Sequence, residues 1–229
     1  MQTVIDTHNV SKVYQEAVPV HAVNNVHLHI EKGEFVALVG PSGSGKTTLL
    51  NMIGGLDKPT TGHVEVGGVN ITGLKDNELI DFRLKNIGFV FQSYNLIPVL
   101  TAGENIEFIM LLQGRGKSER TARVVELLRE VGIEDKRDTR PSDLSGGQQQ
   151  RVAVARALAS KPQFVLADEP TANLDSKSAS TLLDMMLTLN REEQMTFVFS
   201  THDARVIERA RRVITLEDGR VVSDVPNAA

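Results

Sequence analysis

Short and almost continuous apolar runs recur in two parts of the chain, residues 1–92 and 161–229. Runs of about five apolar positions between polar residues are typical of strands that are buried on both faces of a parallel sheet. We therefore expect an α/β core in these two parts, with strands at 35–39, 87–91, 164–167, 196–200 and 213–216.

The intervening residues, 93–160, show helical spacing instead. Thr101 and Glu104 have the form of a capping box before an apolar run. A second helix ends at Gly132 and places apolar residues at i, i+3, i+4 and i+7, namely Val124, Leu127, Leu128 and Val131. The pattern predicts one domain over 1–229, in which a helical subdomain interrupts the α/β core.

A glycine-rich segment follows the first of these strands and precedes a predicted helix. It matches the phosphate-loop pattern G-x-x-x-x-G-K-[ST] at every fixed position and reads Gly40-Pro41-Ser42-Gly43-Ser44-Gly45-Lys46-Thr47. Glycines let a backbone approach an anion, and Lys46 would reach the β- and γ-phosphates of a nucleotide. We expect Thr47 to hold Mg²⁺ and count Thr48 with the nucleotide-binding residues. A surface turn could have the same glycine-rich composition, but it would not need to lie between a strand and a helix.

Two acids end another apolar run. Asp168 comes where the strand meets its carboxyl end, the edge at which open α/β sheets bind ligands. We expect Asp168 to hold Mg²⁺, and Glu169 to orient or deprotonate the attacking water. Two solvated acids at a strand end are a common alternative, which the phosphate loop disfavours.

The segment 144–148, with the sequence LSGGQ, opens another helix. Ser145 and Gln148 have capping-box spacing, whereas Gly146 and Gly147 each cost roughly 1 kcal/mol relative to alanine in a helix. Either a ligand approaches the backbone here or the glycines form a loose hinge; physical reasoning alone leaves both open.

Composition narrows the possible partners. The net charge of −4 argues against a broad nucleic-acid surface, and the absence of cysteine excludes disulfides and thiolate metal sites. Neither a secretory signal nor an apolar run of about 18–20 residues is visible. A role at a membrane would therefore require a second chain.

Together these motifs resemble the ATP-binding cassette (ABC) ATPases, over about residues 3–222. The finer match is to the bacterial lipoprotein-release, macrolide-export and cell-division group, on segments 55–62, 87–92, 95–98 and 166–171. The resemblance implies a P-loop core with a mixed sheet, an antiparallel β subdomain, and helices at 93–160 inserted between 1–92 and 161–229.

The resemblance also implies roles for further residues. Tyr14 would stack on adenine, and an ordinary strand aromatic is the less favoured alternative. Gln92 would contact Mg²⁺ or the lytic water, His202 the γ-phosphate, and Asp175 the seam of a dimer. Glycine is frequent in this group at the position of Ala172, and the departure affects only the fine geometry of the loop. We interpret the other five histidines as structural or exposed.

The implied assembly is a head-to-tail dimer in which the phosphate loop of one copy and the signature residues of the other enclose ATP; the signature residues are Ser145, Gly146, Gly147 and Gln148. A membrane permease would dock near residues 93–101, and the chain would be cytoplasmic, on the inner face of the membrane. The segment is unusually apolar for a loop, which also fits plain subdomain core.

Other users of the same motifs fit less well. Chromosome and DNA-repair ATPases insert coiled coils or zinc modules between the phosphate loop and the signature, and the 98 residues from Lys46 to Leu144 leave no such room. Translation-factor relatives carry two cassettes, and small GTPases need an N-K-x-D motif. A degenerate regulatory subunit would not need Glu169 and His202.

Overall fold

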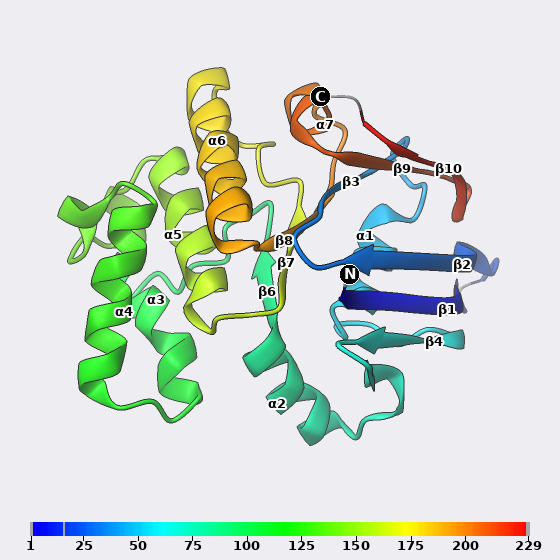
Figure 1. Ribbon diagram of the computed structural model, residues 1–229, viewed down its shortest axis with the longest axis horizontal. Coiled ribbons are helices and arrows are strands. Elements are labelled where there is room, and N and C mark those ends of the chain that lie inside the picture. The colour runs from blue at the N-terminus through cyan, green and yellow to red at the C-terminus, as the bar shows by residue number, and fades with distance from the viewer. Residues whose placement is uncertain (1, 16, 228–229) are drawn as a thin grey trace.

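A six-stranded sheet forms the centre of the computed structural model, which describes residues 2–15 and 17–227 (Figure 1). Its order is β10-β9-β3-β8-β7-β6, parallel except for β10, which runs antiparallel to β9. The strands are β3 (Phe35–Val39), β6 (Ile87–Val90), β7 (Phe164–Asp168), β8 (Thr196–Ser200), β9 (Arg212–Glu217) and β10 (Arg220–Pro226). The five predicted runs are therefore strands.

A smaller antiparallel sheet has the order β2-β1-β4-β5. Its strands are β1 (Thr3–Tyr14), β2 (Val20–Glu31), β4 (Thr61–Val66) and β5 (Val69–Asn70). Helix α1 (Lys46–Ile53) packs between the two sheets, because Leu49, Met52 and Ile53 belong to one apolar cluster with residues of both.

Helices cover the opposite face of the large sheet. Successive residues of β3 alternate between the two apolar clusters: Phe35 and Ala37 face α5 (Gly146–Ala159) and α6 (Ser176–Glu193), whereas Val36 and Leu38 face α1. Burial on both faces explains the continuous apolar runs in the sequence.

The remaining helices flank this core. Helices α3 (Ala102–Leu112) and α4 (Lys117–Glu130) lie beside α5, at the left of Figure 1 and away from β1, β2 and β4. Thr101 and Glu104 form the predicted capping box of α3. Helices α2 (Asp76–Asn86) and α7 (Ala204–Arg209) and short 3-10 turns at Ile71–Gly73, Glu134–Lys136 and Pro141–Asp143 complete the chain.

The predicted fold class, a mixed sheet with an antiparallel β subdomain and added helices, is confirmed. The sequence analysis missed α2 and α7, because each buries only one residue in the apolar core, Leu79 and Val206 respectively. Within residues 2–15 and 17–227, no helix combines the length and apolar character needed to span a bilayer.

Candidate functional site

Residues 40–48 lie together between the end of β3 and the first turns of α1. Gly40 has φ 147°, and a Cβ there would lie 2.1 Å from the carbonyl oxygen of Leu216. Gly45 has φ 97°, and its Cβ would meet the carbonyl oxygen of Ala22 at 2.1 Å. The loop is thus wedged between β9 and β2, and only glycine fits at these two positions.

Lys46 is almost fully buried, and its Nζ donates hydrogen bonds to the carbonyl oxygens of Gly40 and Pro41, both at 2.9 Å. The ammonium group is therefore held over the loop. Ser44 Oγ is buried and has no hydrogen-bond partner among the described residues. Because buried hydroxyls are normally satisfied, this atom suits a site that receives an acceptor-rich ligand.

Thr47 and Asp168 come together from α1 and the end of β7, as the sequence predicted. Thr47 Oγ1 donates to Asp168 Oδ1 at 3.1 Å. Mg²⁺ prefers oxygen ligands at about 2.0–2.1 Å in octahedral geometry, which puts neighbouring ligand oxygens roughly 3 Å apart. The two side chains therefore fit a shared magnesium site.

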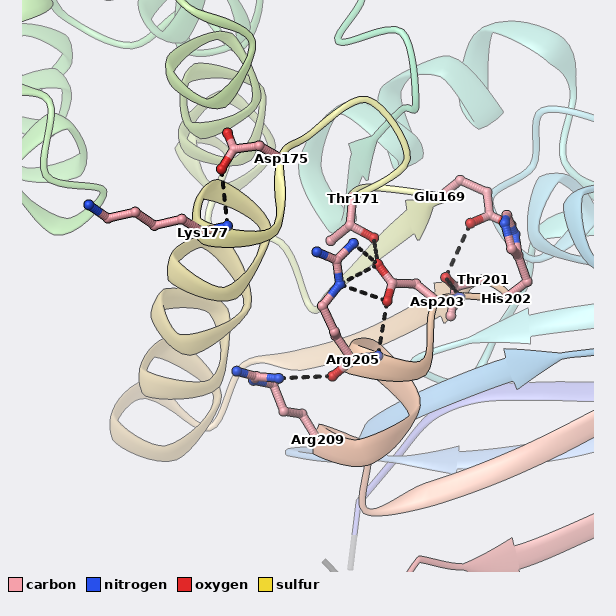
Figure 2. Close-up of polar contacts among 9 residues, drawn as sticks. All are labelled: Glu169, Thr171, Asp175, Lys177, Thr201, His202, Asp203, Arg205 and Arg209. Carbon is pink, nitrogen blue, oxygen red and sulfur yellow. Dashed lines mark hydrogen bonds and ion pairs between the residues drawn. The ribbon is translucent and has the colours of Figure 1, made fainter.

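Glu169 has an unusual backbone conformation, with φ 45°. Its amide donates to the carbonyl oxygen of Ser200 at 2.8 Å, so the residue turns away from β7 while it stays tied to β8. The carboxylate accepts from Thr201 Oγ1 at 3.1 Å and lies 2.7 Å from His202 Nδ1 (Figure 2). A carboxylate only accepts, so Nδ1 carries the proton in this pair. The carboxylate is largely buried, whereas His202 is exposed.

Asp203 is a site residue that the sequence analysis missed. It accepts from Thr171 Oγ1 at 2.6 Å and from both Nε and Nη2 of Arg205 (Figure 2). The Arg205 guanidinium, helped by Thr171, lowers the pKa of Asp203 from 3.8 to about 2. Asp203 thereby ties the segment after β8 to the segment after β7. The only sequence signal for Asp203 was its position directly after Thr201 and His202.

The signature segment begins α5 as predicted. Ser145 Oγ accepts from the amide of Gln148 at 3.3 Å, and Gln148 Oε1 accepts from the amide of Ser145 at 2.9 Å. A Cβ on Gly146 would lie 2.8 Å from the hydroxyl of Tyr94, and one on Gly147 would lie 3.1 Å from Ser178 Oγ. Close packing within the chain is thus a further reason for both glycines.

Gln92 and Asp175 lie on the two segments that adjoin this helix. Gln92 follows β6, and its carbonyl oxygen accepts from Asn173 Nδ2 at 2.9 Å. Asp175 is the N-cap of α6 and accepts from the amide of Lys177 at 3.0 Å (Figure 2). It also accepts from the amide of Ser178 at 3.0 Å. The Ser178 hydroxyl lowers the pKa of Asp175.

Tyr14 ends β1 and is about one third exposed. Its hydroxyl donates to Asp57 Oδ2 at 2.8 Å, and Lys12 Nζ lies 5.0 Å from the centre of its ring. Burial and the Asp57 carboxylate raise the pKa of Tyr14. The ring is held in a fixed place, partly open to solvent.

The apolar segment 93–101 has a dual character. Leu96 packs on the core, Val99 is 72% exposed, and Ile97 lines a groove. Arg156 of α5 donates to the carbonyl oxygen of Tyr94 at 2.8 Å, and burial lowers the pKa of this arginine. The segment thus joins residues of the subdomain core to exposed apolar residues, and the partner surface stays a prediction.

The groove has a volume of about 630 Å³. It lies between α2, β6, α3 and α5, and mainly apolar side chains line it. Among these, Leu56, Ile80 and Leu112 are exposed large apolar residues. The sequence analysis indicated only segment 93–101 as part of this groove, because its other walls come from segments distant in the chain.

Comparison with known proteins agrees with this geometry. The ABC transporter family model matches residues 23–172. An uncharacterized ABC transporter ATP-binding protein of Methanocaldococcus jannaschii, MJ0796, is 47% identical over 95% of this chain and 94% of its own length. The dimeric structure of a post-hydrolysis state of MJ0796 bound to ADP and Pi matches with a TM-score of 0.90 and covers 97% of this chain and 98% of that one.

Two bacterial relatives have more specific names. The lipoprotein-releasing system ATP-binding protein LolD 1 of Chlorobium chlorochromatii is 48% identical over 88% of this chain and 82% of its own length. The macrolide export ATP-binding/permease protein MacB of Mannheimia succiniciproducens is 44% identical over 90% of this chain but only 32% of its own length. With the phosphate loop, the paired acids and the signature helix in place, the chain belongs to the ABC transporter family and is one of its ATP-binding cassettes.

Proposed function

We propose that this chain hydrolyses ATP to ADP and phosphate in a Mg²⁺-dependent reaction. Residues 40–48 bind the phosphates, with Lys46 as the main positive charge, and the partly exposed ring of Tyr14 stacks on adenine. Thr47, Asp168 and Gln92 would hold Mg²⁺, which when bound offsets charge on the β- and γ-phosphates.

The observation that carries this proposal is the hydrogen-bonded group at Glu169. Thr201 and His202 fix both carboxylate oxygens of Glu169 next to Asp168. A carboxylate oriented in this way can position a water molecule and accept its proton. With Nδ1 bonded to Glu169, the Nε2 atom of His202 would be free to contact the γ-phosphate of bound ATP.

Two variants test the chemistry. Lys46→Ala should abolish nucleotide binding, measured with a fluorescent ATP analogue. Glu169→Gln should keep ATP binding and slow hydrolysis by about 10²–10⁴-fold, the usual contribution of general acid–base catalysis. Wild-type turnover in Glu169→Gln would show that another residue has the catalytic role. Tight MgATP binding by Lys46→Ala would refute the assignment of the phosphate site.

The signature residues indicate that ATP is enclosed between two copies of the chain. Among the described residues, no hydrogen bond joins Ser145, Gly146, Gly147 or Gln148 to the phosphate loop of the same chain. The amino end of α5 instead presents backbone N–H groups that suit an anion. The proposed partner for this surface is the phosphate loop of a second copy, with Asp175 at the seam.

Dimerisation can be measured by light scattering after size exclusion. Glu169→Gln with MgATP should elute as a dimer, and without nucleotide as a monomer. Adding Ser145→Arg to that variant should abolish the dimer, because the arginine would occupy the space of the phosphates. A dimer that persists with Ser145→Arg would show that the copies meet at another surface.

The groove beside segment 93–101 is the proposed docking site for a membrane permease, at the cytoplasmic face of the membrane. Its exposed residues Ile80 and Leu112 suit a short apolar helix, and its residue Ile97 lies five positions after Gln92. The partner could therefore sense the nucleotide state. The names of LolD 1 and MacB support a lipoprotein-release or macrolide-export type of complex.

Replacing apolar residues of the groove with charged ones tests this docking site. Ile80→Asp with Leu112→Asp should retain ATP-dependent dimerisation and lose co-purification with the membrane permease. The matched control is Val222→Asp, which changes an equally exposed apolar residue on β10. Permease binding that survives in the double variant would place the coupling surface elsewhere.

A further inference from the structure

A cluster of histidine and carboxylate side chains covers the outer face of the antiparallel sheet. None of its members belongs to the nucleotide site. Alternation along each strand creates this face: Ile5 and Thr7 of β1 are buried, whereas Asp6 and His8 between and after them point outward. The same alternation adds His27 and His29 from β2 and His63 and Glu65 from β4.

Strand register brings these side chains together. In the pairing of β1 with β4, Asp6 lies opposite Glu65 and His8 opposite His63. The rings of His8 and His63 stack with their centres 4.4 Å apart. An irregularity between Thr7 and Val10 in the pairing with β2 leaves the centres of the His8 and His27 rings 5.7 Å apart. His8 is therefore common to both halves of the cluster.

His8 Nε2 is the central atom. It is buried and has no hydrogen-bond partner among the described residues, and the same is true of Asp6 Oδ1. Two carboxylate oxygens, Asp6 Oδ2 and Glu65 Oε2, lie 3.6 and 3.9 Å from His8 Nε2. These distances are too long for hydrogen bonds. They are close to the roughly 3.3–3.6 Å between two ligands of one tetrahedral zinc ion, which has bonds of about 2.0–2.2 Å.

We propose that this face binds one divalent transition-metal ion of the zinc class, with His8 Nε2 as the shared ligand. Two ligand sets are available, each with ligand atoms within 4.8 Å of one another: Asp6, His8 and His27, or His8, His63 and Glu65. Imidazole nitrogen favours Zn²⁺, Ni²⁺ or Cu²⁺ over Mg²⁺ and Ca²⁺. The carboxylates of Asp6 and Glu65 would balance the charge of the ion.

Zinc titration of the untagged, metal-stripped and nucleotide-free protein tests the proposal. Isothermal calorimetry should find one Zn²⁺ per chain. His8→Ala should weaken this binding more than about tenfold, since even indirect ligand contacts contribute that much. Asp6→Asn, which preserves shape, should also weaken binding and serves if His8→Ala does not fold. The thermal midpoint of the wild type should rise with Zn²⁺, and that of His8→Ala should not.

Two matched controls separate this site from other histidines. His21→Ala removes an exposed histidine of β2 that lies outside the cluster, and His202→Ala removes the histidine of the nucleotide site. Both should bind Zn²⁺ as the wild type does, and ATP hydrolysis by His8→Ala should be unchanged. The proposal is overturned if the wild type shows no saturable binding, if His8→Ala (or Asp6→Asn in its place) binds normally, or if His202→Ala loses the site.

Discussion

Replacing Asn105 with alanine should loosen the segment that follows Gln92 without touching the nucleotide. The Asn105 side chain is fully buried at the start of α3. Its Oδ1 accepts from the amide of Ile97 at 2.8 Å, and its Nδ2 donates to the carbonyl oxygens of Ile97 and Leu100, both at 3.2 Å. The side-chain amide of Asn105 thus bonds to the backbone at both ends of the turn from Ile97 to Leu100.

The size of the effect follows from the groups that lose a partner. The carbonyl oxygen of Ile97 keeps a bond from the amide of Leu100, so two backbone groups are left unsatisfied: the Ile97 amide and the Leu100 carbonyl. Each such group costs about 1–3 kcal/mol when buried. Water can reach the exposed side of the segment, so we expect a loss of roughly 2–4 kcal/mol in the free energy of unfolding.

Urea unfolding and permease binding are the two measurements, and Asn190→Ala is the matched control. Asn190 is also fully buried, and its Nδ2 donates to the carbonyl oxygens of Gly33 and Met195 at 2.9 and 2.7 Å. Both variants should lose similar stability, but only Asn105→Ala should weaken permease binding. An Asn105→Ala protein as stable as the wild type would refute the hydrogen-bond reasoning. Equal loss of permease binding in both variants would refute the local role.

Two further predictions concern single interactions. Because Arg205 lowers the pKa of Asp203 to about 2, its ionised form stabilises the fold above pH 4, and this contribution is lost as pH falls through 2. Asp203→Asn should therefore reduce the free energy of unfolding by about 2 kcal/mol at pH 7 in urea titrations. The difference from wild type should narrow below pH 4, and a constant difference down to pH 2.5 would contradict this cause. Gly40→Ala should abolish ATP-analogue binding, because its Cβ would lie 2.1 Å from the Leu216 carbonyl oxygen. Gly68→Ala, which has φ 80° and open space around its Cβ, should cost only about 1–2 kcal/mol, and normal binding by Gly40→Ala would show that the loop can shift.

Features that one contiguous segment specifies were predictable from the sequence. The strand before the phosphate loop is continuously apolar, because side chains on both faces of β3 are buried. The capping boxes at Thr101 and Ser145 involve residues only three positions apart, and both form as expected. Such local patterns leave few alternatives for the backbone.

Features that depend on contacts between distant segments could not be predicted from the sequence. Leu96 and Val99 are both apolar residues of one loop, yet Leu96 is packed on the core and Val99 is exposed. The five histidines other than His202 were interpreted as structural or exposed, and four of them gather on one face. Seeing that face required the register of β1 against β4 and the irregularity beside Asn9.

Helix α5 connects the two proposed interfaces. Its first turn contains Gly146, and ten residues later Arg156 donates a hydrogen bond to the carbonyl oxygen of Tyr94 beside the groove. At 1.5 Å per residue, these two points are about 15 Å apart along the helix axis. A tilt of about 10° about one end would displace the other by roughly 3 Å, more than a hydrogen bond can stretch. If the proposed partner in the groove tilted α5 by this angle, the amino end of the helix would move far enough to make or break a hydrogen bond at the proposed dimer seam.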